Sequence, residues 1–143
     1  MWWIYHLWVI GFQIAALACY AIGSYRFYKN IKNFMKFLTL GIILDIIMAI
    51  GASSGFLPRM EEGQSVVWTS PLFITHIILS GFGLFSFIFL YIYLIIKGTD
   101  KEYPRLRKIQ FKIFLPCWIV GVSIGLINFF AKVLFQIRLY DFI

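Results

Sequence analysis

Charged residues and cysteines are both scarce in this chain. Only 13% of its 143 residues are charged, whereas 62% are hydrophobic, and the mean hydropathy is +0.86. A soluble domain carries about 45–50% apolar residues, so this composition excludes one. The two cysteines, Cys19 and Cys117, form no CxxC pair, which excludes a zinc ribbon or a dithiol redox motif. We expect both thiols to act as small apolar residues inside helices.

The apolar residues fall into four long runs. A hydrocarbon core of about 30 Å needs about 20 apolar residues in a helix, and each run is long enough. We therefore predict an all-α, polytopic integral membrane protein, with a single four-helix transmembrane domain over residues 1–143. Ser70 or Thr69 is expected to cap the third helix, because Pro71 suits its first turn. The four transmembrane helices are predicted at residues 2–24, 37–57, 71–96 and 109–130.

The net charge of +7 is concentrated in the predicted connections. The loops at residues 25–36 and 97–108 are rich in lysine and arginine, whereas the loop at residues 58–70 has one arginine and two glutamates. The positive-inside rule makes the two basic loops cytoplasmic and both termini outside, in the inner (cytoplasmic) membrane of the cell. Orientation accounts for the charge, so we expect no nucleic-acid partner. The first run has no basic residue before Arg26, so we interpret it as a retained helix and not as a secretory signal.

Two histidines lie inside the apolar runs. At a rise of 1.5 Å per residue, His6 and His76 both lie roughly 7 Å below the outer ends of their predicted helices. Two histidines at one depth can ligate a haem iron axially, as in a protein with haem b, and they can equally bind copper. Ser80 and Gly83 share a face with His76 and leave room for a neighbouring helix or for a flat macrocycle. The alternative is that His76 hydrogen-bonds a neighbouring helix.

Asp45 is the one acidic residue expected within a membrane helix. A carboxyl group at that depth costs about 2.5–3.5 kcal/mol on insertion scales and marks a functional site by default. Gln13 is predicted near the middle of the bilayer and could donate a hydrogen bond to Asp45, whereas Asn128 is predicted nearer the outer end of its helix. The interpretations that stay open are a structural hydrogen bond, a proton relay and a contact to a quinone.

The fourth run contains a glycine pair at the spacing GxxxG. Gly121 and Gly125 permit close approach of another helix, either inside the bundle or on a partner protein. Pro116 precedes them, and we expect it to kink this helix or to start it.

Two segments resemble a known family. THIILS at residues 75–80 and FLPCWIVGVSIG at residues 114–125 are similar to the third and fourth helices of a small four-helix bacterial membrane family of unknown function. Some members are assembly factors for caa-type cytochrome oxidases. The family carries further histidines where this chain has residues 32–35 and 103–107 without one, so only His76 carries over as a functional residue. The resemblance implies a fold that is kept and a histidine site that is partly lost.

We therefore expect a non-catalytic accessory or assembly subunit of a respiratory or electron-transfer membrane complex. Its expected partners are the lipid bilayer, other integral membrane subunits and a quinone. The alternative is a small b-type cytochrome that passes electrons between a quinone and an outer-face partner through one haem held by His6 and His76.

Overall fold

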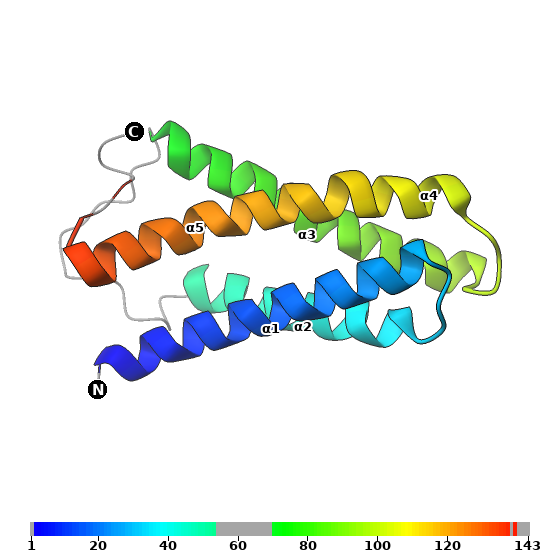
Figure 1. Ribbon diagram of the computed structural model, residues 1–143, viewed down its shortest axis with the longest axis horizontal. Helices are drawn as coiled ribbons and strands as arrows, with labels where there is room; N and C mark the ends of the chain where they lie inside the picture. Colours follow the sequence, from blue (N-terminus) through cyan, green and yellow to red (C-terminus); the bar gives the residue numbers. More distant parts are fainter. Residues whose placement is uncertain (1, 54–69, 138, 140–143) are drawn as a thin grey trace.

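The chain folds into four long helical rods that run side by side (Figure 1). The computed structural model describes residues 2–53, 70–137 and 139, together with their side chains except those of residues 2–7 and 51–53. Within these ranges every regular element is helical, which confirms the predicted all-α class. The elements are α1 (Trp2–Tyr28), α2 (Phe34–Ser53), α3 (Pro71–Lys97), α4 (Pro104–Ile109), the π-helical turn η1 (Gln110–Phe114) and α5 (Leu115–Phe135).

Three of these rods are long and apolar enough to cross a membrane. They are Trp8–Tyr28, Pro71–Lys97 and the continuous helix Pro104–Phe135. The shortest of them has 21 residues and therefore spans about 32 Å, close to the thickness of the hydrocarbon core. Large apolar side chains such as Phe85 and Phe89 are exposed on the outside of the bundle, where acyl chains would cover them. The helices thus belong in a lipid environment.

The start of α3 follows from local chemistry. The hydroxyl oxygen of Ser70 accepts a hydrogen bond from the backbone N–H of Phe73 at 3.3 Å, and Pro71 occupies the first turn, where its missing N–H costs nothing. Gly98 ends the helix with a φ of 91°, a conformation that favours glycine. The expected cap at Ser70 is confirmed; the alternative cap at Thr69 and the predicted outer loop lie outside the described residues.

The last rod begins earlier than the sequence indicated. A helix was expected from residue 109, but α4 starts at Pro104, because proline is tolerated in a first turn and the following Arg-Leu-Arg-Lys segment favours helix. Pro116 lies in the first turn of α5, within a helix that continues from Pro104 to Phe135. The turn before Pro116 is a π-helix, in which the N–H of Leu115 donates to the carbonyl of Gln110, five residues earlier. Such a wider turn lets a helix pass a proline without stopping.

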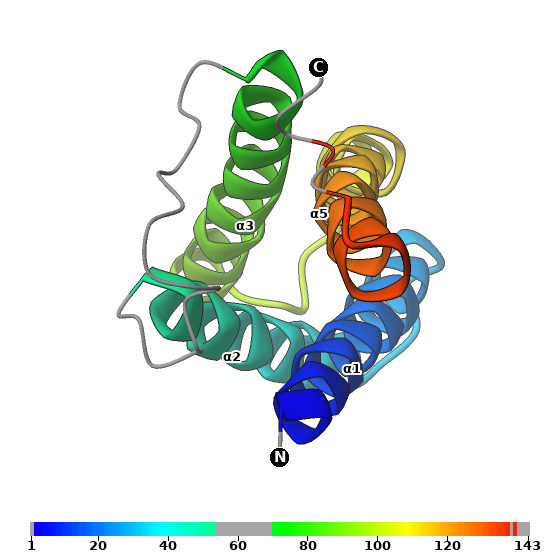
Figure 2. The same cartoon turned by 90° about the vertical axis from the view of Figure 1, so that its left-hand side faces the viewer.

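The rods form two antiparallel pairs. Helix α1 packs mainly on α2, and α3 packs mainly on α5 (Figure 2). The start of α1 and the end of α5 lie at one end of the bundle, and the connections after α1 and α3 lie at the other (Figure 1). The buried residues gather between the pairs and toward the end with these connections, with Tyr20, Phe27, Leu38, Phe87 and Trp118 almost completely covered.

Candidate functional site

Asp45 lies at the junction of three helices. Its carboxylate on α2 accepts a hydrogen bond from the indole Nε1–H of Trp118 on α5 at 2.7 Å. It accepts a second from the hydroxyl of Tyr20 on α1 at 3.3 Å. Both donors are fully buried, and Asp45 is half-buried. Two donors aimed at one carboxylate offset part of the cost of placing it among apolar helices.

Aromatic packing completes this junction. The ring of Tyr20 stacks on Phe87 of α3 with centroids 4.2 Å apart, and its edge meets Trp118 at 4.7 Å. We call Tyr20, Asp45, Phe87 and Trp118 the central cluster, because it takes one residue from each rod. Gly41 makes room for it, since a Cβ added there would lie 2.9 Å from the ring of Tyr20. The cluster joins the α1–α2 pair to the α3–α5 pair.

The donors to Asp45 are not the ones that the sequence suggested. Gln13 was expected to donate, but neither Gln13 nor Asn128 is among the partners of Asp45 in the described structure. Tyr20 and Trp118 were missed. Each combines a large apolar ring with one polar donor, which is the residue type that buries well only when the donor finds a partner. The presence of Tyr20 and Trp118 in apolar runs was the signal in the sequence, but it could not show that these two residues face Asp45.

His76 is held by a neighbouring helix. Its Nδ1 lies 2.6 Å from the backbone carbonyl oxygen of Gly121 on α5. A carbonyl only accepts, so Nδ1 carries the proton and donates it. The imidazole fits against Gly125, where an added Cβ would lie 2.6 Å from Cε1 of the ring. Gly121 and Gly125 therefore pack α5 against α3 inside the chain. The structure shows the hydrogen bond from His76 to a neighbouring helix.

The space beside His76 that a macrocycle would need is taken up by α5. A Cβ added at Gly83 would overlap Trp118, and one added at Gly121 would overlap the backbone of Ser80. The small residues thus bring α3 and α5 into backbone contact, and they do not fit a haem on this face. His6 lies on α1, but its side chain is outside the described part. Among the described residues no group of three or more His, Cys, Asp or Glu is placed to hold a metal ion.

No family model, curated protein or solved structure matches this chain. The resemblance to the small four-helix bacterial membrane family of unknown function stays a prediction. Function is therefore argued from the residues themselves.

A second polar contact lies in the π-helical turn. Gln110 is completely buried, and its amide Nε2–H donates to the hydroxyl of Ser24 on α1. Sequence patterns did not predict this contact, because Gln110 lies at the start of the predicted helix at residues 109–130. The wider turn changes which residues of the helix face α1, and such turns occur frequently at functional sites. The contact joins α1 to the last rod near the basic connections.

Removing the hydroxyl of Ser24 tests this contact. Ser24→Ala leaves the buried amide of Gln110 without its partner, so we expect the free energy of unfolding to fall by about 1–3 kcal/mol in detergent titrations. Replacing Gln110 by Leu in that background should restore part of the loss, since no amide is then left unpaired. Thr39→Ala is the control, because the hydroxyl of Thr39 bonds only within its own helix, to the carbonyl of Met35 at 2.8 Å; a change there as large as at Ser24 would contradict the assignment.

Proposed function

We propose that the protein is a non-catalytic accessory or assembly subunit of a larger respiratory or electron-transfer membrane complex. The proposal rests on the hydrogen bonds that polar side chains of the helices make within the chain. Asp45, His76 and Gln110 each hydrogen-bond another helix of the same chain. Groups engaged in this way hold a scaffold together, whereas a proton or electron carrier would present them to a substrate or a pathway.

The proposal includes α2 as a fourth membrane span. Its 20 residues have the necessary length, and a broad apolar face that includes Leu40, Ile43 and Ile47 is exposed. An even number of spans returns the chain to its starting side. With the basic connections in the cytoplasm, both termini lie outside the inner membrane.

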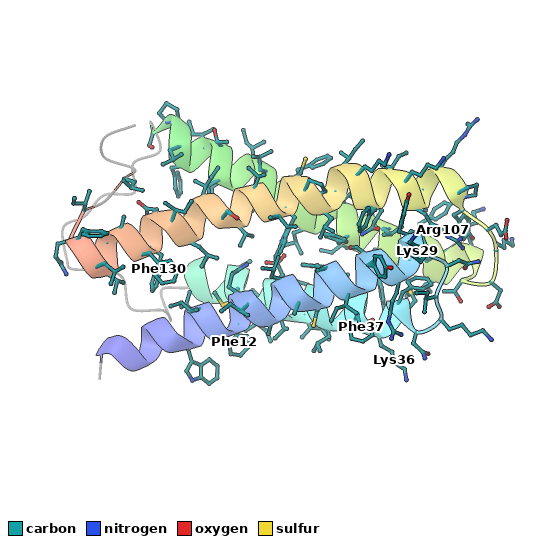
Figure 3. The ribbon with its side chains drawn as sticks, viewed as in Figure 1. Phe12, Lys29, Lys36, Phe37, Arg107 and Phe130 are labelled. Atoms are coloured by element: carbon teal, nitrogen blue, oxygen red, sulfur yellow. The ribbon has the colours of Figure 1, made fainter. Side chains whose placement is uncertain are left out.

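An apolar depression between α1 and α2 supports the expectation of a partner subunit. It has a volume of about 340 Å³ and is lined by Trp8, Gly11, Phe12, Ala15 and Leu44. The ring of Trp8 stacks at a centroid distance of 4.8 Å on Phe12, which Figure 3 labels on α1. A Cβ added at Gly11 meets no atom within 4 Å, so this small residue is not used by packing within the described chain. A small-residue face suits close approach of a helix from another subunit.

The migration of the protein in native gels tests the proposal. We expect the tagged protein, extracted from its own membranes in a mild detergent, to run in a complex several times its own 16.7 kDa. Gly11→Leu should release it from that complex without lowering its melting temperature, because the added side chain occupies open space. Gly81→Leu is the matched control, since Gly81 also has no atom within 4 Å of an added Cβ but lies on α3.

A visible spectrum separates the scaffold from the cytochrome alternative. We expect a featureless dithionite-reduced minus oxidised spectrum from the purified, folded chain. A sharp α band that disappears in His76→Ala would overturn the scaffold proposal and support one haem b between His76 and His6. A monomer of normal stability in native membranes would also contradict it.

A further inference from the structure

Ten of the eleven described lysine and arginine residues lie toward one end of the bundle. None of the cations at this end forms an ion pair with Asp100 or Glu102, the two carboxylates that the described chain has there. Like charges so close together repel one another and favour anions from outside the chain. Figure 3 shows three of these side chains, Lys29, Lys36 and Arg107, at this end. The described cations at this end are Arg26, Lys29, Lys32, Lys36, Lys97, Lys101, Arg105, Arg107, Lys108 and Lys112.

Arg107 is held in place by residues at and just beyond the end of another helix, α1. It lies in the first helical turns after Pro104, and its Nη2–H donates to the side-chain oxygen of Asn30 at 2.7 Å. Its guanidinium lies over the ring of Phe27, 5.7 Å from the centroid. Its Nε–H is buried and has no acceptor within the described chain. Protein atoms cover this Nε, so a ligand from outside the chain reaches the guanidinium through its terminal amino groups.

A second cation and an apolar surface adjoin Arg107. Lys29 directly precedes Asn30 and is exposed, with its ammonium 5.8 Å from the ring centroid of Tyr28. Tyr28 in turn stacks on Phe111 at 4.8 Å, which ties the end of α1 to the π-helical turn. Tyr28 and Phe111 are half-buried, and Phe111 lies one turn beyond Arg107 on the same face of its helix.

From this arrangement we infer that the junction of α1 and α4 binds the phosphate of an anionic phospholipid. The phosphate accepts hydrogen bonds from the terminal amino groups of Arg107 and is attracted by the positive charge of Lys29. The acyl chains lie along Tyr28 and Phe111. Phosphate oxygens suit the planar fork of arginine. Charge complementarity points to an anion, and the half-buried aromatic pair Tyr28 and Phe111 beside the cations makes a lipid a better occupant than free phosphate. Basic pockets at the ends of transmembrane helices bind anionic headgroups in this way.

Native mass spectrometry of the protein in neutral detergent tests the inference. We expect the first molecule of dioleoyl phosphatidylglycerol to bind more tightly than dioleoyl phosphatidylcholine. Arg107→Gln should weaken phosphatidylglycerol binding by more than about tenfold, because charge and hydrogen bonds are lost together. Lys36→Gln removes the same charge from the same end, but Lys36 is exposed and contacts no partner in the described chain. For Lys36→Gln we expect the affinity for phosphatidylglycerol to fall less than about threefold, because only the long-range attraction of one charge, screened by salt, is lost.

Asn30→Gly is a second variant that keeps the net charge. The φ of Asn30 is 58°, which glycine adopts easily, so the backbone turn is preserved while the oxygen that holds Arg107 is lost. Weaker binding of phosphatidylglycerol with unchanged helicity supports a positioned site, and unchanged affinity contradicts it. Equal losses in Arg107→Gln and Lys36→Gln would overturn the inference in favour of diffuse charge. Displacement of the lipid by an equal concentration of inorganic phosphate would overturn the choice of a lipid as the ligand.

Discussion

Gly121→Ala is expected to lower the free energy of unfolding by about 3 kcal/mol, at the upper end of what overpacking costs. An added Cβ would overlap the backbone of α3, lying 2.8 Å from the carbonyl carbon of Leu79 and 2.9 Å from Cα of Ser80. Backbone atoms cannot rotate away as a side chain does, so α3 and α5 must separate. That separation would also lengthen the hydrogen bond from His76 to the carbonyl of Gly121. Thermal unfolding in detergent, followed by tryptophan fluorescence, measures the loss.

Gly81→Ala is the matched control for this prediction. Gly81 lies on the same α3 that Gly121 contacts, but a Cβ added there meets no atom within 4 Å. Alanine is favoured over glycine in a helix interior by about 1 kcal/mol, so this variant should be slightly more stable than the parent. Equal effects of the two substitutions would contradict the close contact between α3 and α5.

Asp45→Leu is expected to loosen the two helix pairs from each other. It removes the acceptor of two buried donors, the indole of Trp118 and the hydroxyl of Tyr20. Leaving such donors unpaired costs about 1–3 kcal/mol. Asp45→Asn keeps an acceptor oxygen in place and should cost less. Unfolding in mixtures of detergent and dodecyl sulfate gives both values.

A double-mutant cycle isolates the contact that joins α2 to α5. Trp118→Phe removes the indole donor and keeps an aromatic ring. Combined with Asp45→Leu, we expect a coupling energy of about 1–2 kcal/mol, near the upper values measured between membrane helices. A coupling energy near zero, or a greater stability of Asp45→Leu than of the parent, would contradict the role of Asp45 in joining the pairs. It would also reopen the proton-relay and quinone interpretations of this residue.

The predictions for Gly121→Ala and Asp45→Leu both test contacts between helices of the same chain, which are the contacts that support the proposed function. The central cluster and the contact between α3 and α5 hold four rods in one arrangement with the polar groups turned inward. If both predictions hold, the polar residues of the membrane helices are accounted for by architecture. The surfaces left for function are then the outside of α1 and α2 and the basic end.

Local features of the chain were predictable because they depend on neighbours in the sequence. Apolar runs of about 20 residues require helices in a bilayer, since backbone groups must be satisfied within each segment. The start of α3 followed from Ser70 and Pro71, and the basic end followed from the charges between the runs. The earlier start of the last rod at Pro104 was missed, because a basic, polar segment is compatible with both a loop and a first helical turn.

The partners of the polar residues were decided by the tertiary structure. Asp45 and Trp118 are 73 positions apart, and His76 and Gly121 are 45 positions apart. Periodicity shows which residues share a face of a helix, but it does not show how each helix is rotated or which helix it faces. Those rotations depend on the close fit of glycines against rings and backbone, at Gly41 between α1 and α2 and at Gly83 and Gly121 between α3 and α5. The sequence alone therefore determined that this is a helical protein of the membrane, and packing decided that its buried aspartate and His76 bind other helices of the chain.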